Sequence, residues 1–176
     1  MWEKTRKKID LLLEGILVFL MAANVINVLW QVFTRFILKN PSSFTEELAR
    51  YLLIWVGLLG AAYASGRKMH LAIDIILENL KARAKKIAEF VIQVIVFLFA
   101  LLAMVIGGIR LVIITLSLNQ ISAALRIKLG YVYLVIPLSG LLIMFYAASS
   151  FINRLKAKEN KNKKDLISEK TSDLTV

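Results

Sequence analysis

Long apolar runs alternate with short polar segments along the chain, and four of the runs are long enough to be helices that cross a membrane. Such a helix needs ~20 mainly apolar residues to cross ~30 Å of hydrocarbon. The second run reaches this length only if its helix begins near Thr45 and takes in a charged turn. The pattern predicts an all-α membrane protein with four transmembrane helices, at about residues 11–36, 45–66, 87–112 and 130–153.

The connection between the second and third predicted spans is too long for a tight turn. Its sequence, HLAIDIILENLKARAKK, places apolar residues at helical spacing on one side and charged residues on the other. We therefore expect an amphipathic helix over about residues 71–83, lying in the membrane interface, with its basic end held by anionic lipid at the cytoplasmic face. The alternative is that this segment simply extends the third span.

After Arg154 the chain loses its apolar character, and the remaining segment is rich in lysine. A segment with so little apolar surface does not fold alone. The pattern predicts one integral membrane domain, residues 1–155, followed by a disordered basic cytoplasmic tail, residues 156–176. Because 176 residues are shared among four spans, there is no room for a separate soluble domain.

Basic residues are distributed unevenly among the segments that flank the apolar runs. The N-terminal segment, the second connection and the tail hold four, six and seven Lys or Arg residues, whereas the first and third connections hold three each. The positive-inside rule therefore predicts that both termini lie in the cytoplasm, an N-in/C-in topology. The net charge of +11 is also typical of nucleic-acid binding, but here the basic residues lie next to apolar runs. We expect anionic lipid as a partner and no nucleic acid.

The composition excludes most kinds of enzyme. Hydrophobic residues make up 59% of the chain, whereas an ordinary soluble domain is roughly 45–50% apolar. The chain has no cysteine and a single histidine, His70, so thiolate metal sites, cysteine nucleophiles and haem ligation by paired histidines are excluded. It contains no nucleotide-binding or hydrolase motif. We expect no catalytic residue, no metal site and no cofactor.

The second predicted span opens with charged residues in the segment SSFTEELAR. Ser43 is a suitable N-cap, and Glu46, three residues later, can complete a capping box. Glu47 lies in the first turn, where the helix dipole favours a carboxylate, and Arg50 can pair with either acid. Two explanations stay open. The charges stabilise the start of the helix, or they contact another helix or a partner protein, because charges at the membrane border usually face protein or water.

Small residues recur along the same predicted helix. Gly57 and Ala61 are four apart, and Gly60 and Ala64 form a second row of the same kind. Small residues at this spacing let helix backbones approach closely in lipid. The helix is therefore predicted to be packed on two sides, one against its own bundle and one available to another subunit. Trp55 lies too deep for an interfacial aromatic belt and is expected to pack against another helix or a partner.

Two stretches of this sequence combine polar residues with an apolar helix pattern: EELARYLLIWVGLLGAAYA, residues 46–64, and RKMHLAID, residues 67–74. They resemble the small membrane subunit of tripartite ATP-independent periplasmic transporters, or TRAP transporters. The resemblance covers about residues 5–155, and its most specific parts are the acid-acid-x-x-Arg start of the second span and the His-x-x-x-Asp element after it. The residues that match the recurrent polar positions of that family are Glu46, Glu47, Arg50, His70 and Asp74.

The resemblance implies a small permease subunit in the bacterial inner membrane. In that family the small subunit pairs with a large multi-span subunit that carries the substrate and sodium sites. A soluble periplasmic substrate-binding protein delivers an organic acid to this symporter. The small subunit then acts mainly as a scaffold for the large one.

Polar and close-packing residues occur together on the second predicted span without catalytic companions. We expect the charged residues at its start to fix the outer end of this helix against neighbouring helices. Trp55, Gly57 and Ala61 are expected to help dock the large subunit. His70 and Asp74 are expected to hold the start of the interfacial helix against the bundle.

Two other interpretations stay open: a self-contained small transporter or pore assembled as an oligomer, and a structural four-span subunit of another complex. A carrier that acts alone usually has ionisable groups at mid-membrane. Glu14, the one acid near the first span, lies near its cytoplasmic end. Arg110 is expected at the far end of the third span, where it can extend outward to the interface.

Overall fold

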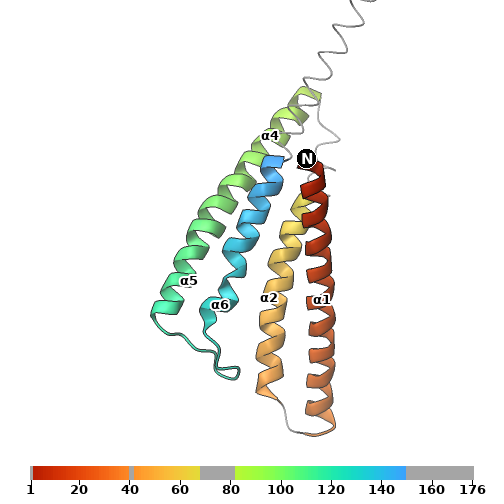
Figure 1. The fold of residues 1–176 in the computed structure, drawn as a ribbon, viewed down its shortest axis with the longest axis vertical. Coiled ribbons are helices and arrows are strands. Elements are labelled where there is room, and N and C mark those ends of the chain that lie inside the picture. Colours follow the sequence, from red (N-terminus) through yellow and green to blue (C-terminus); the bar gives the residue numbers. More distant parts are fainter. Residues whose placement is uncertain (1, 40–41, 68–81, 150–176) are drawn as a thin grey trace, which may run out of the picture.

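The computed structural model describes residues 2–39, 42–67 and 82–149, and these residues form a bundle of long helices (Figure 1). The helices, in chain order, are α1 (Trp2–Phe36), α2 (Ser43–Gly66), α4 (Ala82–Phe99), the π-helix η1 (Ala100–Gly107), α5 (Gly108–Ser117) and α6 (Leu129–Tyr133). After a turn at Leu134, the chain continues from α6 as a helix over residues 135–149.

Among the described residues, four helical stretches are long and apolar enough to cross a membrane, which confirms the predicted all-α membrane protein with four spans. The third span runs as one rod through α4, η1 and α5, and it ends five residues beyond the predicted residue 112. Most of the predicted interfacial helix, and the predicted tail, lie outside the described residues. The four stretches are Arg6–Phe36, Ser43–Gly66, Phe90–Ser117 and Leu129–Ser149.

The bundle has two distinct ends. The start of α1, the end of α2 and the end of the fourth span lie together at one end, which we call the terminal end (Figure 1). The connections that follow α1 and α5 lie at the opposite end, which we call the loop end. Each span therefore crosses from one end to the other, as expected for four consecutive membrane helices.

One side of α1 faces the bundle, and much of its remaining surface is exposed. The inward positions recur at alternating intervals of three and four residues, the spacing that keeps one helix face against a partner. Towards the loop end these positions become polar, and Asn27 donates a hydrogen bond from Nδ2 to the carbonyl of Thr45 in α2 (2.7 Å). Such hydrogen bonds between helices stabilise packing where lipid removes the hydrophobic drive. The inward residues are Leu13, Leu17, Leu20, Asn24, Asn27, Gln31 and Thr34.

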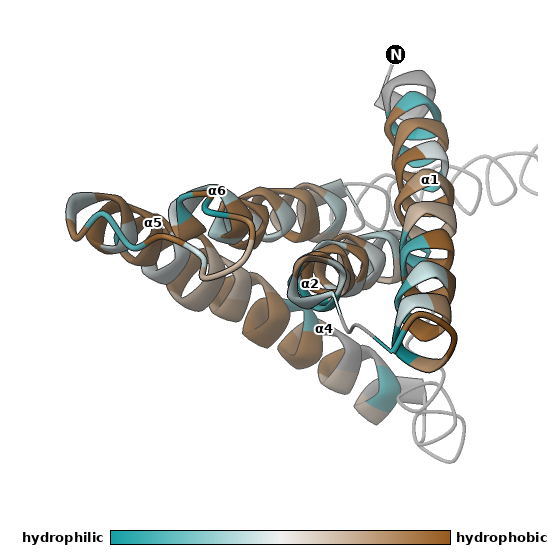
Figure 2. Cartoon of the chain, turned by 90° about the horizontal axis from the view of Figure 1, so that it is seen from below, coloured by the Kyte–Doolittle hydropathy of each residue, from teal (hydrophilic) through white to brown (hydrophobic). Residues whose placement is uncertain are grey.

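Two apolar clusters hold the four spans together. One joins α1, α2 and the fourth span through Leu13, Leu59 and Tyr146. The other joins α2, η1 and the fourth span and includes Ala62 and Met104. Because α2 and the fourth span belong to both clusters, they form the centre of the bundle, and Figure 2 shows α2 between α1 and the other helices.

Close contact between the third and fourth spans depends on glycine. A Cβ atom on Gly140 would lie only 2.7 Å from the Cβ of Met104 in η1, and one on Gly108 would lie 3.0 Å from the Cδ of Pro137. The missing side chains let the two backbones approach at the wider π-helical turns. Pro137 also explains the break in the fourth span, because it cannot donate to the carbonyl of Tyr133, where α6 ends.

Candidate functional site

Glu47 joins the start of α2 to the connection between the third and fourth spans. Its Oε2 accepts hydrogen bonds from the backbone N–H groups of Ala124 (2.7 Å) and Leu125 (2.9 Å). Its Oε1 accepts a hydrogen bond from the Tyr51 hydroxyl, one turn along α2 (2.6 Å). Hydrogen bonds to a charged acceptor are stronger than those between neutral groups. A single side chain therefore fastens the connection after α5 to the start of α2.

The loop that Glu47 holds is shaped by its own backbone. Ile121 and Lys128 face each other in an antiparallel bridge, and the N–H of Ser122 donates to the carbonyl of Ile127 (2.9 Å). Arg126 adopts a left-handed backbone conformation with φ 53°, which non-glycine residues rarely do. This tight hairpin directs two adjacent N–H groups towards α2, where the carboxylate receives them.

The predicted capping box at the start of α2 is wrong. Ser43 is the first residue inside the helix, and the N-cap is Ser42, whose side chain makes no capping hydrogen bond. The Thr45 hydroxyl instead donates to the carbonyl of Ser42 (2.9 Å), while Asn27 of α1 donates to the carbonyl of Thr45. The start of α2 is thus stabilised in part by a contact from α1, in place of the capping box expected within α2 itself.

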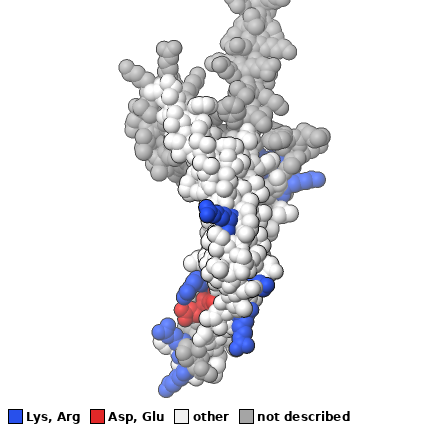
Figure 3. Space-filling view, turned by 90° about the vertical axis from the view of Figure 1, so that its left-hand side faces the viewer, with Lys and Arg blue, Asp and Glu red and all other residues white. Residues whose placement is uncertain are grey.

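Glu46 and Arg50 form a pair on the surface of α2. Their side-chain atoms lie 3.3 Å apart, and both side chains are more than 60% exposed. Figure 3 shows acidic and basic side chains adjacent to each other near the loop end, below a largely uncharged surface. An exposed pair four residues apart contributes little to stability, so these two charges remain accessible to another molecule.

The two rows of small residues on α2 face different surroundings. A Cβ on Gly60 would lie 4.0 Å from the Cδ2 of Leu17 in α1, so this row faces the bundle. Gly57 and Ala61 are exposed, and a Cβ on Gly57 would meet nothing within 4 Å. We call the exposed line along this helix the α2 stripe. Its members are Glu46, Arg50, Leu53, Gly57 and Ala61.

Trp55 packs within the chain's own bundle. Its indole Nε1 donates a hydrogen bond to the carbonyl of Val132 in α6 (3.1 Å), and its ring contacts the first apolar cluster. The indole is half-buried. His70 and Asp74, the other predicted site residues, lie outside the described residues.

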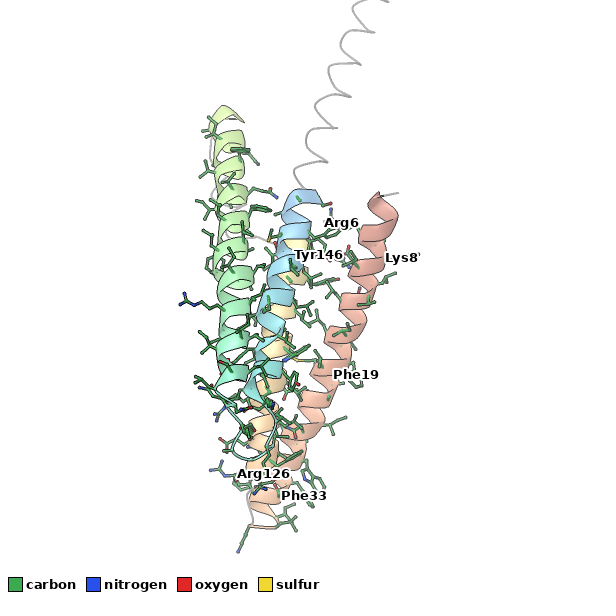
Figure 4. All side chains as sticks on the ribbon, turned by 60° about the vertical axis from the view of Figure 1, so that its left-hand side comes forward. Arg6, Lys8, Phe19, Phe33, Arg126 and Tyr146 are labelled. Atoms are coloured by element: carbon green, nitrogen blue, oxygen red, sulfur yellow. The ribbon has the colours of Figure 1, made fainter. Side chains whose placement is uncertain are left out.

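A second polar group, at the terminal end, was not predicted from the sequence. Tyr146 of the fourth span donates a hydrogen bond from its hydroxyl to Asp10 of α1 (2.5 Å). Arg6 donates to the carbonyl of Gly66 at the end of α2, and its Cζ lies 5.8 Å from the centre of the Tyr146 ring. Figure 4 shows Arg6 beside Tyr146 at this end. The group therefore joins α1, α2 and the fourth span.

Glu14 belongs to the same end and is only partly covered. Its Oε2 lies 3.7 Å from Arg67 and accepts a hydrogen bond from the Tyr63 hydroxyl (3.4 Å). The guanidinium of Arg67 also lies over the Tyr63 ring, at 5.1 Å. The sequence gives only a weak signal for these contacts. Tyrosines occur late in the second and fourth spans and acids occur early in the first span, and all three positions fall at the same end of a four-span bundle.

The polar groups of the described residues are suited to joining helices and not to bond chemistry. Carboxylates accept from backbone N–H groups, tyrosines or arginines, and no group of three His, Asp or Glu side chains in the described part of the chain is placed to hold a metal ion. The remaining prominent feature is the exposed α2 stripe. The α2 stripe is therefore the candidate site for contact with another protein.

The chain also matches a known protein family. Residues 24–157 match the sequence profile of a family described as tripartite ATP-independent periplasmic transporters, DctQ component. The match includes the α2 stripe, Glu47 and the loop that it holds. It begins within α1, so Arg6, Asp10 and Glu14 lie before it.

Three curated relatives share part of this sequence. The sialic acid TRAP transporter small permease protein SiaQ of Vibrio cholerae is 38% identical over 101 residues, which cover 56% of this chain and 58% of the relative. A putative TRAP transporter small permease protein of Haemophilus influenzae is 25% identical over 131 residues, which cover 74% and 80%. The isethionate TRAP transporter permease protein DctMQ of Oleidesulfovibrio alaskensis is 30% identical over 96 residues, which cover 54% of this chain but 15% of the relative.

Proposed function

The chain belongs to the DctQ component family of TRAP transporters, and on that premise we propose that it is a small permease subunit that scaffolds a large sodium-coupled membrane subunit. In this proposal the large subunit takes up an organic acid that a periplasmic binding protein delivers. The chain is a component of a transporter permease in the bacterial inner membrane, not an enzyme.

The observation that supports scaffolding most is the contrast between the interior of the bundle and the α2 stripe. Apolar side chains such as Leu59 and Val135 are almost completely buried in the interior, and the buried polar side chains among the described residues are uncharged Asn, Thr and Ser. A carrier acting alone usually needs ionisable groups or a polar path at this depth. By contrast, Gly57 and Ala61 are exposed on a central helix, where small residues permit close approach by a further helix.

The partner in this proposal is a large multi-span membrane chain. The DctMQ relative supports this choice, because the region similar to this chain is only 15% of a much longer permease protein. A short unit and a long unit in one polypeptide are expected to lie together in the membrane. We propose the same pairing for this chain, with the α2 stripe as the docking surface and Trp55 supporting that surface from within the bundle.

The proposed topology places the terminal end in the cytoplasm and the loop end in the periplasm. Lys7 and Lys8 are exposed at the terminal end, where they would meet anionic headgroups of the cytoplasmic leaflet. Because the chain has no cysteine, single cysteines give a clean test. Lys8→Cys should be labelled only from the cytoplasm, and Lys39→Cys only from the periplasm. The reverse pattern would refute the topology and, with it, the proposed lipid contact.

The docking surface is tested by filling it. The double variant Gly57→Leu/Ala61→Leu should reduce co-purification of the large subunit by roughly tenfold, because leucine keeps the backbones apart. Gly15→Leu is the matched control: a Cβ at Gly15 also meets nothing within 4 Å, but this glycine lies on α1. Unchanged co-purification of the double variant would eliminate the α2 stripe as the docking surface.

A further inference from the structure

Arg110 is the only charged residue in the third span, Phe90–Ser117. It is exposed on α5, and it takes part in neither of the two ion pairs found among the described residues nor in their hydrogen bonds. Figure 3, which faces the side of α4 and α5, shows a basic side chain standing apart in the uncharged middle of this face. A lone charge in a membrane span is costly and usually has a function.

The packing corrects the expectation that Arg110 lies at the far end of its span. Trp55, in the middle of α2, donates its hydrogen bond to the carbonyl of Val132. Along the fourth span, Pro137 lies little more than one helical turn beyond Val132 towards the terminal end, and it faces Gly108 of α5. Arg110 follows Gly108 by two residues, or about 3 Å of helical rise. It therefore lies within about one helical turn of the mid-depth of α2.

A lipid phosphate is a poor match for Arg110 at this depth. The nearer end of the helix, Ser117, is seven residues away, or roughly 10 Å along the axis. Side chains on a helix tilt towards its N-terminus, which for α5 means away from that nearer end. To reach a lipid headgroup beyond Ser117, the Arg110 side chain would have to point towards the C-terminus of α5, against this tilt.

A second copy of this chain offers no carboxylate at the depth of Arg110. The sequence has no acid between Glu47 and Asp74, and none between Glu89 and Glu159. Of the acids with described contacts, Asp10 and Glu14 lie at the terminal end, while Glu46 and Glu47 lie at the loop end. Two copies at equal depth in the bilayer would therefore place Arg110 opposite apolar residues.

The surface around Arg110 leaves room for a partner side chain. Gly107, three residues earlier and thus on the same face, is exposed and has no side chain. The tilt of the Arg110 side chain directs it over this glycine. Ile106 and Ile113 are exposed on either side, so a guanidinium here is surrounded by apolar surface, where a carboxylate is the group that compensates its charge.

We propose that Arg110 pairs, near mid-membrane, with a carboxylate of a second membrane protein. This inference rests on the proposed function, in which that protein is the large TRAP subunit. The pair fixes the depth and rotation of the partner against α5. Charge discriminates between partners here, while the α2 stripe supplies close packing.

The test uses this chain co-expressed with its large subunit. Arg110→Leu should reduce retention of the large subunit after prolonged washing in mild detergent by roughly tenfold, since the partner carboxylate is left unpaired. Arg110→Lys should stay within about twofold of the original chain, because it keeps the charge. Arg35→Leu, which removes an exposed arginine from the last turn of α1, is the matched control and should change nothing.

A photo-reactive side chain in place of Ile113 identifies what lies beside Arg110. The expected product joins this chain to the large subunit. Products with lipid alone, or with a second copy of this chain, would overturn the inference, as would full retention with Arg110→Leu. Suppose that the large subunit co-purifies with the unaltered chain but not with the Gly57→Leu/Ala61→Leu variant. Full retention of the large subunit by Arg110→Leu would then reject only the ion pair and leave the proposed function in place. If the unaltered pair never co-purifies, both the ion pair and the proposed function are rejected.

Discussion

The two ends of the bundle are fastened by different means. At the loop end one carboxylate, Glu47, accepts three hydrogen bonds, two of them from backbone groups 77 and 78 residues away. At the terminal end the contacts are shared among Arg6, Asp10 and Glu14 of α1, each with its own partner. The comparison teaches that one substitution can release the connection after α5 from α2, whereas the terminal end loses its contacts one at a time.

Glu47→Ala is expected to have the largest effect of any single substitution at these two ends. It leaves the Ala124 N–H without its acceptor, leaves the Leu125 N–H with only the Ser122 hydroxyl (3.2 Å), and removes the partner of Tyr51. We expect the melting temperature of the detergent-solubilised chain to fall by several degrees. We also expect a cysteine introduced at Ala124 to be alkylated faster. Glu46→Ala is the control, because its exposed pair with Arg50 should matter little, and equal effects of the two variants would remove the distinction between the adjacent glutamates.

Gly66→Ala is expected to have the next largest effect, at the terminal end. The added Cβ would lie 2.6 Å from a ring carbon of Tyr146, whose hydroxyl is held by Asp10. Overpacking of this kind costs about 1–3 kcal/mol. Gly57→Ala makes the same chemical change where nothing lies within 4 Å, so it should leave the unfolding free energy of the chain unchanged or slightly raised. Equal unfolding free energies for the two variants would show that Gly66 does not pack closely against Tyr146.

Tyr146→Phe is expected to have the smallest of the three effects. It removes one hydrogen bond, to Asp10, and leaves the ring in place. Polar contacts between membrane helices contribute about 0.6 kcal/mol on average and rarely more than about 1.7 kcal/mol. Tyr131→Phe is the control, since Tyr131 is 58% exposed. A loss as large as that of Glu47→Ala would show that the terminal end also depends on one residue.

Hydropathy alone was sufficient to predict the four spans. An apolar run of spanning length has few alternatives to a membrane helix, because lipid cannot satisfy the hydrogen bonds of any other backbone conformation. The spacing of the small residues also predicts two rows on α2, and the structure distinguishes them by placing Gly60 against α1 and leaving Gly57 exposed.

Contacts between distant segments could not be predicted in the same way. Local spacing suggested that Ser43 and Glu46 form a capping box, but the start of α2 is stabilised by Asn27 of another helix. The acceptor role of Glu47 depends on a hairpin more than 70 residues away. The depth of Arg110 depends on how Gly108 packs against Pro137. None of these relations leaves a periodic signal in the sequence.

The most direct test of the scaffold proposal is sodium-dependent uptake in liposomes that contain this chain, its large subunit and the periplasmic binding protein, with each component omitted in turn. The proposal predicts that uptake requires both membrane chains and the binding protein, and that this chain alone carries nothing. Uptake by this chain alone would contradict the proposal and would make it a self-contained transporter.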